Sequence, residues 1–391
     1  ISPMCLAFIV SDGMGAHAAL DTIKEYDMVK IAKLTLDGYF NYGNVLQRYA
    51  LQHVLSLYVD DVVDVIRNDN DPRPKSPGWW SLRKLAKFIL NWHGYRDFVL
   101  GHILEQEKVR QSRIKHFVQT RTKYVDAMSA RQMDAAYDYV VVGSDQVWNP
   151  YFGRPDVFTL RGISPEKRIA YAASLGIPDI PEKFRPIFKE EVQKFKAVSV
   201  REEQAKVALE RLTGRMDIVV VPDPTLVLSK EEWGEIAERP KWLGDEKYLL
   251  TYFLGPKPDF LEKLSKELGL KLIQFLGDDF DSYVTSPEEF VYLISHASLV
   301  YTDSFHGTVF SILHDRPFVV CDRIGDQVSA NMGSRIDTLL RLFHLEERRG
   351  TAANHYQIEN PLEITYKDKE KILKEQRQKA DDFLRKALNL K

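Results

Sequence analysis

The feature that most constrains this chain is the alternation of short apolar runs with segments whose apolar residues recur at helical spacing. Residues 297–321 show it best. Leu299 to Tyr301 predicts a buried strand, a polar loop comes next, Val309 to Leu313 continues at helical spacing, and Pro317 opens a second apolar run. A strand, a loop, a short helix and another strand are typical of a parallel α/β sheet, in which ligands bind at the carboxyl ends of the strands.

The alternation occurs in both halves of the chain, with a proline-containing segment at residues 217–228 between them. The predicted strands are residues 31–36, 137–142, 168–176 and 197–200 in the first half, and 248–254, 270–275 and 299–301 in the second. Two successive α/β units predict two Rossmann-like domains that face each other across a cleft, and a length of 391 residues suits two such domains.

We therefore expect an N-terminal domain at residues 28–228 and a C-terminal domain at residues 229–391, the latter with a charged, amphipathic final helix at residues 366–391. Residues 1–27 differ in character from the rest of the chain and are set apart as an N-terminal extension of uncertain origin.

The composition is that of a soluble globular protein, with 44% hydrophobic and 28% charged residues. A net charge of -2 predicts no overall attraction to nucleic acid or to a membrane. Cys5 and Cys321 lie far apart and suggest neither a disulfide framework nor a zinc site, so a reducing cytoplasm fits best. No metal-ligand spacing stands out, and we expect no metal and no bound cofactor.

A basic helical insertion is predicted at residues 79–123. Residues 73–123 contain 12 Lys and Arg against 3 Asp and Glu, and from Trp79 to Trp92 the apolar residues share one helical face. We expect the insertion to pack on the first domain. The alternative is peripheral contact with an anionic membrane surface, to which each cation adds about 1 kcal/mol.

The loop after the strand at residues 299–301 has the composition of an anion site. Free backbone N–H groups at the helix start, the hydroxyls of Ser304 and Thr308, the backbone of Gly307 and the His306 imidazole converge there. This combination suits a phosphate or a carboxylate. The helix dipole contributes roughly 0.3 to 1 kcal/mol, so the anion also needs a cationic partner from elsewhere.

Three strand ends of the first half carry further candidates for the same cleft. Asn41 and Asn44 lie in a glycine-containing turn before a helix. Ser144, Asp145, Gln146 and Trp148 come after the strand at residues 137–142 and suit a sugar or an organic acid, although Asp145 could simply cap the next turn. Arg201 comes after the strand at residues 197–200. It could grip a carboxylate or phosphate with its planar fork, or pair with Glu202 or Glu203 at the surface.

Taken together, these segments resemble the polysaccharide pyruvyltransferase family. The resemblance runs from about Met28 to Leu345 through NYGNVLQRYALQ, VVGSDQVWNP, AYAASLG, SVREE, PDPTLVL and TDSFHGT, in this order. It implies a fold like that of GT-B glycosyltransferases. It also implies phosphoenolpyruvate as donor, a sugar of a cell-surface glycan or its lipid-linked precursor as acceptor, and a pyruvate ketal as product.

The resemblance also implies roles for single residues. His306 would match the essential histidine of the family, Arg201 the arginine that grips the donor, and the turns at Asn41–Asn44 and Ser144–Asp145 would line the cleft. Some members carry arginine two residues before the histidine, where this chain has Ser304, so Arg323 and Arg335 are further candidates for donor binding. We hypothesise that His306 handles protons and phosphate, while Asp145 accepts the proton of the attacking hydroxyl.

Two other functions fit the same architecture. One is a glycosyltransferase that uses a nucleotide-sugar donor, whose phosphates would also lie at a helix start in the second domain. The other is a non-catalytic glycan-binding protein that keeps the cleft as a scaffold. Retention of His306, Arg201 and Asp145 together argues against the second.

Overall fold

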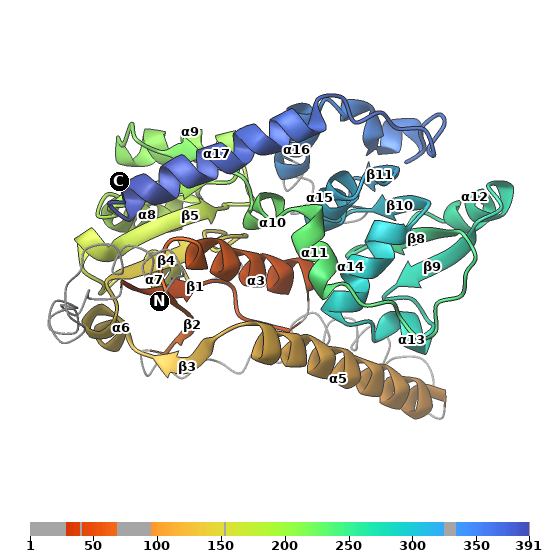
Figure 1. Cartoon of the computed structure of the whole chain (residues 1–391), viewed down its shortest axis with the longest axis horizontal. Coiled ribbons are helices and arrows are strands. Elements are labelled where there is room, and N and C mark those ends of the chain that lie inside the picture. Colours follow the sequence, from red (N-terminus) through yellow and green to blue (C-terminus); the bar gives the residue numbers. More distant parts are fainter. Residues whose placement is uncertain (1–28, 40, 69–94, 152–153, 324–333, 391) are drawn as a thin grey trace, which may run out of the picture.

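The computed structural model describes residues 29–39, 41–68, 95–151, 154–323 and 334–390, with backbone alone for residues 95–104, 126 and 334. These residues form two parallel α/β domains (Figure 1). The predicted membrane-binding segment from Trp79 to Trp92 and the extension at residues 1–27 lie outside the described residues.

The first domain is built on a seven-stranded sheet in the order β3-β2-β1-β4-β5-β6-β7. Every pair of neighbours in it is parallel. Its strands are β1 (Lys30–Leu34), β2 (Asp61–Arg67), β3 (Tyr124–Met128), β4 (Tyr139–Gly143), β5 (Arg168–Ala173), β6 (Ala197–Val200) and β7 (Val219–Val220). Its helices are α3 (Tyr42–Ser56), α5 (Tyr95–Arg121), α6 (Ala130–Ala136), α7 (Pro155–Phe158), α8 (Arg185–Val192), α9 (Glu203–Thr213) and α10 (Pro224–Val227).

The second domain is built on a five-stranded parallel sheet in the order β12-β11-β10-β8-β9. Its strands are β8 (Tyr248–Tyr252), β9 (Lys271–Phe275), β10 (Leu299–Thr302), β11 (Phe318–Cys321) and β12 (Arg349–Gly350). The helices after α10 are α11 (Lys230–Ile236), α12 (Leu261–Glu267), α13 (Phe280–Tyr283), α14 (Pro287–His296), α15 (Phe305–Leu313), α16 (Ser334–Phe343) and α17 (Lys369–Ala387). Two Rossmann-like domains are thus confirmed, the architecture that the GT-B-like class denotes.

Both sheets reverse their strand order, and this locates the candidate site. In the first sheet, β1 lies between β2 and β4. The chain continues from β1 to β2 on one side and from β4 to β5 on the other, so the connections after β1 and β4 run in opposite directions along the sheet. In the second sheet, the chain continues from β8 to β9 on one side and from β10 to β11 on the other, so its order reverses between β8 and β10. Ligands of open α/β sheets bind at such switch points, outside the carboxyl ends of the strands.

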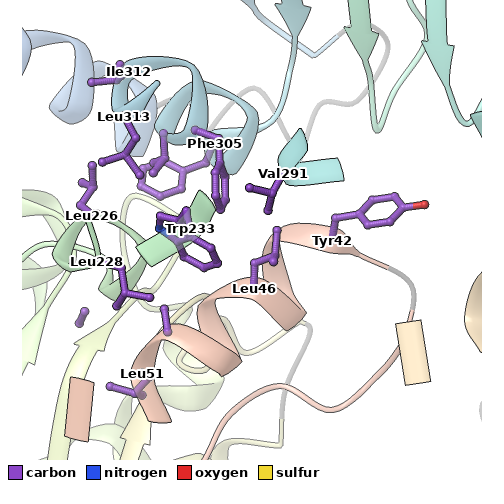
Figure 2. Packing of buried hydrophobic residues seen from close by; sticks show 14 of the residues in the cluster. Tyr42, Leu46, Leu51, Leu226, Leu228, Trp233, Val291, Phe305, Ile312 and Leu313 are labelled. Carbon is purple, nitrogen blue, oxygen red and sulfur yellow. The ribbon is translucent and has the colours of Figure 1, made fainter. Parts of the chain in front are cut away.

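The two domains share one hydrophobic core. Tyr42 and Leu46 of α3 belong to one cluster of buried residues with Trp233 of α11, Val291 of α14 and Phe305 of α15, and Leu46 points toward Val291 and Trp233 (Figure 2). The Tyr42 ring stacks on Phe290 at 5.0 Å between ring centroids, and its hydroxyl donates to the Thr285 carbonyl at 2.7 Å. Helix α3 therefore fixes the first domain against the second.

Helix α5 also bridges the domains. Its Arg113 forms an ion pair with Glu289 of α14 at 3.2 Å, and its Glu107 accepts a hydrogen bond from Tyr283 of α13 at 2.9 Å. The part of the predicted basic insertion that the structure describes therefore packs between the domains, on α3 of the first and on α13 and α14 of the second.

The final helix crosses back to the first domain. The sequence predicts a helix at residues 366–391 within the second domain, and α17 occupies residues Lys369–Ala387. Its Phe383 lies against Tyr171 of β5, with ring centroids 6.2 Å apart, and the Ala387 carbonyl accepts a hydrogen bond from Lys196 at 2.6 Å (Figure 1). The helical pattern identifies the buried face of this helix but not the sheet that buries it.

Candidate functional site

Arg201 lies in the turn between β6 and α9 and is buried, with 5% of its surface exposed. It donates from Nη1 to Asp223 Oδ2 at 2.6 Å and from Nη2 to Asp145 Oδ1 at 3.3 Å. Its guanidinium also lies over the Phe305 ring, 4.5 Å from the centroid. The surface position in the alternative is therefore wrong, because Arg201 points inward across the strand ends. Its expected partner Glu202 is nevertheless close, with 4.0 Å between Arg201 Nε and Glu202 Oε2, and it is buried as well.

Asp223 is the carboxylate on which both domains converge. It caps α10, and its Oδ1 accepts from the backbone N–H and the hydroxyl of Thr225 at 3.1 and 2.7 Å. Its Oδ2 accepts from Arg201 and from Ser144 Oγ, the latter at 2.9 Å. His306 Nε2 of the second domain lies 3.7 Å from the same oxygen. One buried oxygen atom therefore connects three elements of the first domain with the histidine of the second.

His306 is held at the start of α15 by both domains. Its ring is 5% exposed and lies edge-on to Phe305, with centroids 5.3 Å apart. On its Nδ1 side it packs on the first turn of α3. A Cβ atom added to Gly43 would lie only 2.1 Å from Nδ1, so only a glycine allows this approach. The imidazole is thereby confined between the backbone of α3 and Asp223.

Asp145 lies beside this pair, at the end of β4. Besides Arg201, it contacts Asn44, whose Nδ2 donates to Oδ2 at 3.4 Å, and Arg335 of α16, whose Nη1 lies 3.9 Å from Oδ1. Burial would raise the pKa of Asp145, but the charges of Arg201, His306 and Arg335 hold it below its ordinary value. Burial lowers the pKa of Arg335 to about 10, and the charge of Arg201 acts in the same direction.

Burial likewise opposes ionisation of Asp223, but the contact with His306 and the charge of Arg201 hold its pKa well below the ordinary value. The cluster therefore contains three buried carboxylates, because Glu202 Oε2 lies 4.0 Å from Arg201 Nε, together with two guanidinium groups and an imidazole. Three buried nitrogen atoms in it make no hydrogen bond among the described residues: Arg201 Nε, Arg335 Nε and His306 Nε2. Two of them already face a carboxylate, since Arg201 Nε lies 4.0 Å from Glu202 Oε2 and His306 Nε2 lies 3.7 Å from Asp223 Oδ2. Such groups are costly unless an anion pairs with them.

A cavity of ≈ 1370 Å³ opens beside the cluster, between α9 and the helices α16 and α17. Arg201, Asp223, Phe305 and Arg335 line it, whereas His306 does not. The cavity gives the two guanidinium groups access from outside the protein.

The other predicted donor residues on α15 serve the helix itself. Ser304 is its N-cap, and its Oγ accepts from the Gly307 N–H at 3.3 Å. Thr308 Oγ1 donates to the Ser304 carbonyl at 3.0 Å. Arg323, which comes after β11, pairs with Asp303, with 2.9 Å between Arg323 Nε and Asp303 Oδ2. Their roles in donor binding stay predictions.

The predicted acceptor residues separate into two groups. Asn44 and Ser144 lie in the cluster, and Asn41 caps α3 by accepting from the Asn44 N–H at 3.3 Å. Gln146 and Trp148 lie outside it. Gln146 accepts from Asn149, and Trp148 is 1% exposed in the core of the first domain, where its indole N–H donates to the Phe158 carbonyl. A role of these two in acceptor binding stays a prediction.

Two functional candidates were missed from the sequence. Asp223 lies after a strand and before a proline. An aspartate before a proline is typical of the N-cap of a helix, so the sequence indicates a helix start at Asp223 and not a functional site. Glu202 accepts at Oε1 from Ser174 Oγ and from the Leu175 N–H, both at 2.9 Å, and so joins the loop after β5 to Arg201. From the sequence, Glu202 was considered only as a surface partner of Arg201. The contacts with Asp223, Ser174 and Leu175 could not be read from the sequence, because they join distant loops.

Two findings bear on metals and membranes. Among the described residues, no group of three His, Cys, Asp or Glu side chains could hold a metal ion. Within the same residues, none of the helices has the length and apolar character that crossing a membrane requires.

Fold and cluster together define a protein of two Rossmann-like domains with a buried, charged site where they meet. The sequence assigns it more narrowly, because residues 41–324 match the model of the family described as polysaccharide pyruvyl transferase. This match spans well over half of the chain, and the protein belongs to that family, whose members are transferases. A comparison of the sequence with curated proteins finds no significant match.

Solved structures show only distant likeness. UDP-GlcNAc 2-epimerase from Neisseria meningitidis is 12% identical with a TM-score of 0.40, and the alignment covers 90% of this chain and 100% of the epimerase. ADP-heptose LPS heptosyltransferase II from E. coli is 11% identical with a TM-score of 0.33, over 90% of this chain and 100% of the transferase. Similarity at this level carries no conclusion on substrate.

Proposed function

We propose that this chain transfers the pyruvyl group of phosphoenolpyruvate to a sugar of a surface polysaccharide or of its lipid-linked precursor, forming a pyruvate ketal and releasing phosphate. The family match supports pyruvyl transfer to a polysaccharide. The observation that carries the donor is the meeting of Arg201 and His306, from different domains, at one buried carboxylate, beside Arg335, whose Nε makes no hydrogen bond among the described residues.

The chemistry of the donor matches these groups. Phosphoenolpyruvate carries a carboxylate and a phosphate, and each can accept from a guanidinium fork. Helices α3 and α15 both begin at the cluster, so two helix dipoles favour negative charge between them. The donor is thus expected to take Arg201 and Arg335 as its cationic partners, with His306 beside its phosphate.

The reaction needs proton transfer at both ends. The enol carbon of the donor gains a proton, one sugar hydroxyl adds to the adjacent carbon, phosphate leaves, and the second hydroxyl adds to close the ketal. His306 would donate the proton and assist the departure of phosphate. Asp145 would accept the proton of the first hydroxyl. The proton of the second hydroxyl would pass to the departing phosphate, so that the proton given to the enol carbon and the two lost by the hydroxyls balance. The lowered pKa of Asp145 makes it a weak base while Arg201 holds it, so we expect donor binding to draw Arg201 away and restore the basicity of Asp145.

The first prediction tests the donor. In Arg201→Lys the charge remains but the planar fork is lost, so the dissociation constant of phosphoenolpyruvate should rise about tenfold or more. Titration calorimetry would measure the dissociation constant. Phosphate release in the presence of sugar acceptors would measure turnover.

Arg168→Lys is the matched control, because Arg168 is a buried arginine paired with Glu191 at 2.7 Å and lies at the opposite end of β5 from the cluster. It should lose stability but keep donor affinity. Absence of phosphoenolpyruvate binding by the unaltered chain, with phosphate-containing nucleotide-sugars bound instead, would replace the proposal by glycosyl transfer.

A further inference from the structure

Asp223 occupies an unusual position, since it is a carboxylate placed where an anionic donor is proposed to bind. Its Oδ1 is fixed by Thr225, whereas its Oδ2 faces Arg201, Ser144 and His306. Only 1% of its surface is exposed. The oxygen that faces the site is therefore held in place by contacts on the other side of the carboxylate.

The charges in the cluster set up a competition. Arg201 is already paired with Asp223 and with Asp145, and Arg335 contacts Asp145. A donor with two acidic groups has to share these guanidinium groups with three carboxylates, since Glu202 also lies 4.0 Å from Arg201. Repulsion between like charges is strong in a buried site, where the effective dielectric constant is far below that of water. Asp223 must therefore weaken the binding of any anion at Arg201.

A carboxylate that weakens donor binding can still favour the reaction if it increases turnover, and Asp223 can do so through His306. His306 comes from the other domain, and its Nε2 lies 3.7 Å from Asp223 Oδ2. On its other face the ring contacts the backbone of Gly43. At a distance of 3.7 Å the contact between His306 and Asp223 is electrostatic rather than a hydrogen bond, and the Asp223 charge favours the ring orientation in which Nε2 carries a proton and faces Oδ2.

We propose that Asp223 is a positioning residue that orients the His306 imidazole across the domain boundary for turnover, and that its charge at the same time weakens donor binding. This inference rests on the proposed function, since it assigns the residue to the same donor site. The inference predicts that removal of the Asp223 charge increases the affinity for the donor but decreases turnover. A purely structural role of Asp223 does not predict these opposite changes.

The test is Asp223→Asn, which keeps the size of the side chain and leaves an oxygen for Thr225. The dissociation constant of phosphoenolpyruvate should fall roughly three- to tenfold, because a buried like charge is removed. Turnover should fall about tenfold or more, because the histidine loses its orienting partner. Calorimetry gives the affinity, and phosphate release at saturating donor gives the turnover.

Thr225→Val provides the matched control. It removes the hydroxyl contact to Oδ1 but keeps the charge of Asp223, so donor affinity should not increase. If Asp223→Asn does not fold, as judged by circular dichroism, Asp223→Ser answers the same question, because serine is neutral and is also a favoured N-cap.

The outcomes are distinguishable. If the unaltered chain binds phosphoenolpyruvate and the neutral variant binds it equally or more weakly, or turns over at an unchanged rate, the inference is overturned while the proposed function stands. If the unaltered chain does not bind phosphoenolpyruvate, the proposed function fails. Inorganic phosphate then serves as the probe for the charge effect, and equal phosphate affinity in both proteins would overturn the inference.

Discussion

At the scale of single residues, the site depends on two close approaches between domains. The His306 ring contacts the backbone of Gly43 on one side and the Asp223 carboxylate on the other. A glycine near the start of a helix normally lowers stability, because it loses more backbone entropy on folding than alanine does. At Gly43 this cost is explained by the space that the imidazole needs.

Gly43→Ala should therefore reduce activity. The added methyl group would lie 2.1 Å from His306 Nδ1 and 2.4 Å from Cγ, so the ring must move. We expect turnover to fall about tenfold or more, since displacement by about 1 Å can cost about a hundredfold. The measurement is phosphate release from phosphoenolpyruvate under saturating donor.

Gly234→Ala is the matched control, because Gly234 also lies in a helix, and a Cβ atom there would meet nothing within 4 Å. This change should stabilise the protein by about 0.5 to 1 kcal/mol and leave turnover unaltered. Equal activity of the two alanine variants would show that His306 is not confined by Gly43.

The sequence predicted the residues of the site better than their partners. Arg201 and His306 lie just after predicted strands, and the rule that ligands bind at strand ends was sufficient to select them. Asp223, 22 residues after Arg201, was not selected, because nothing local shows that β6 and β7 are neighbours in the sheet. Trp148 was selected because an aromatic ring after a strand suits sugar binding. In the structure its ring packs against Phe188 and Phe195 in the core of the first domain.

At the scale of elements, strand and helix positions were predictable because the apolar periodicity is strong. The strand at residues 197–200 has the predicted boundaries. Helix α15 begins earlier than its apolar residues indicate, at Phe305, because Ser304 caps it. Its other end is held by Lys369 of α17, whose Nζ donates to the Ile312 and Leu313 carbonyls at 3.3 and 3.2 Å.

Lys369→Met should lower the free energy of unfolding by about 1 to 3 kcal/mol, because it leaves buried carbonyl groups without their charged donor while keeping the apolar stem. Chemical denaturation would measure the change. Lys374→Met, on an exposed position of the same helix, should alter stability by no more than about 0.5 kcal/mol. Similar losses in both variants would mean that the contact with α15 contributes nothing measurable.

At the scale of the whole molecule, the two domains share more contacts than the sequence indicates, since two successive α/β units could also have separate cores. Helix α3 of the first domain and helices α11, α14 and α15 of the second contribute to one core. Helix α5 adds polar contacts between the domains, and α17 spans both. Periodicity in the sequence shows which residues are buried, but not that residues of two sheets are buried against each other.

Because the core is shared, we expect one cooperative unfolding transition. Scanning calorimetry should give a single peak whose calorimetric and van't Hoff enthalpies agree. Tyr42→Ala, which removes the stacking on Phe290 and the hydrogen bond to Thr285, should lower the melting temperature of that one peak. Two separate peaks in the unaltered chain would show that the domains unfold independently.

The return of α17 to the first sheet has a consequence for synthesis of the protein. A domain usually folds as it leaves the ribosome, the N-terminal one first. Here Phe383, which covers Tyr171 of β5, is translated only after the entire second domain. We therefore expect the nascent first domain to expose this apolar surface on β5 until α17 has been synthesised.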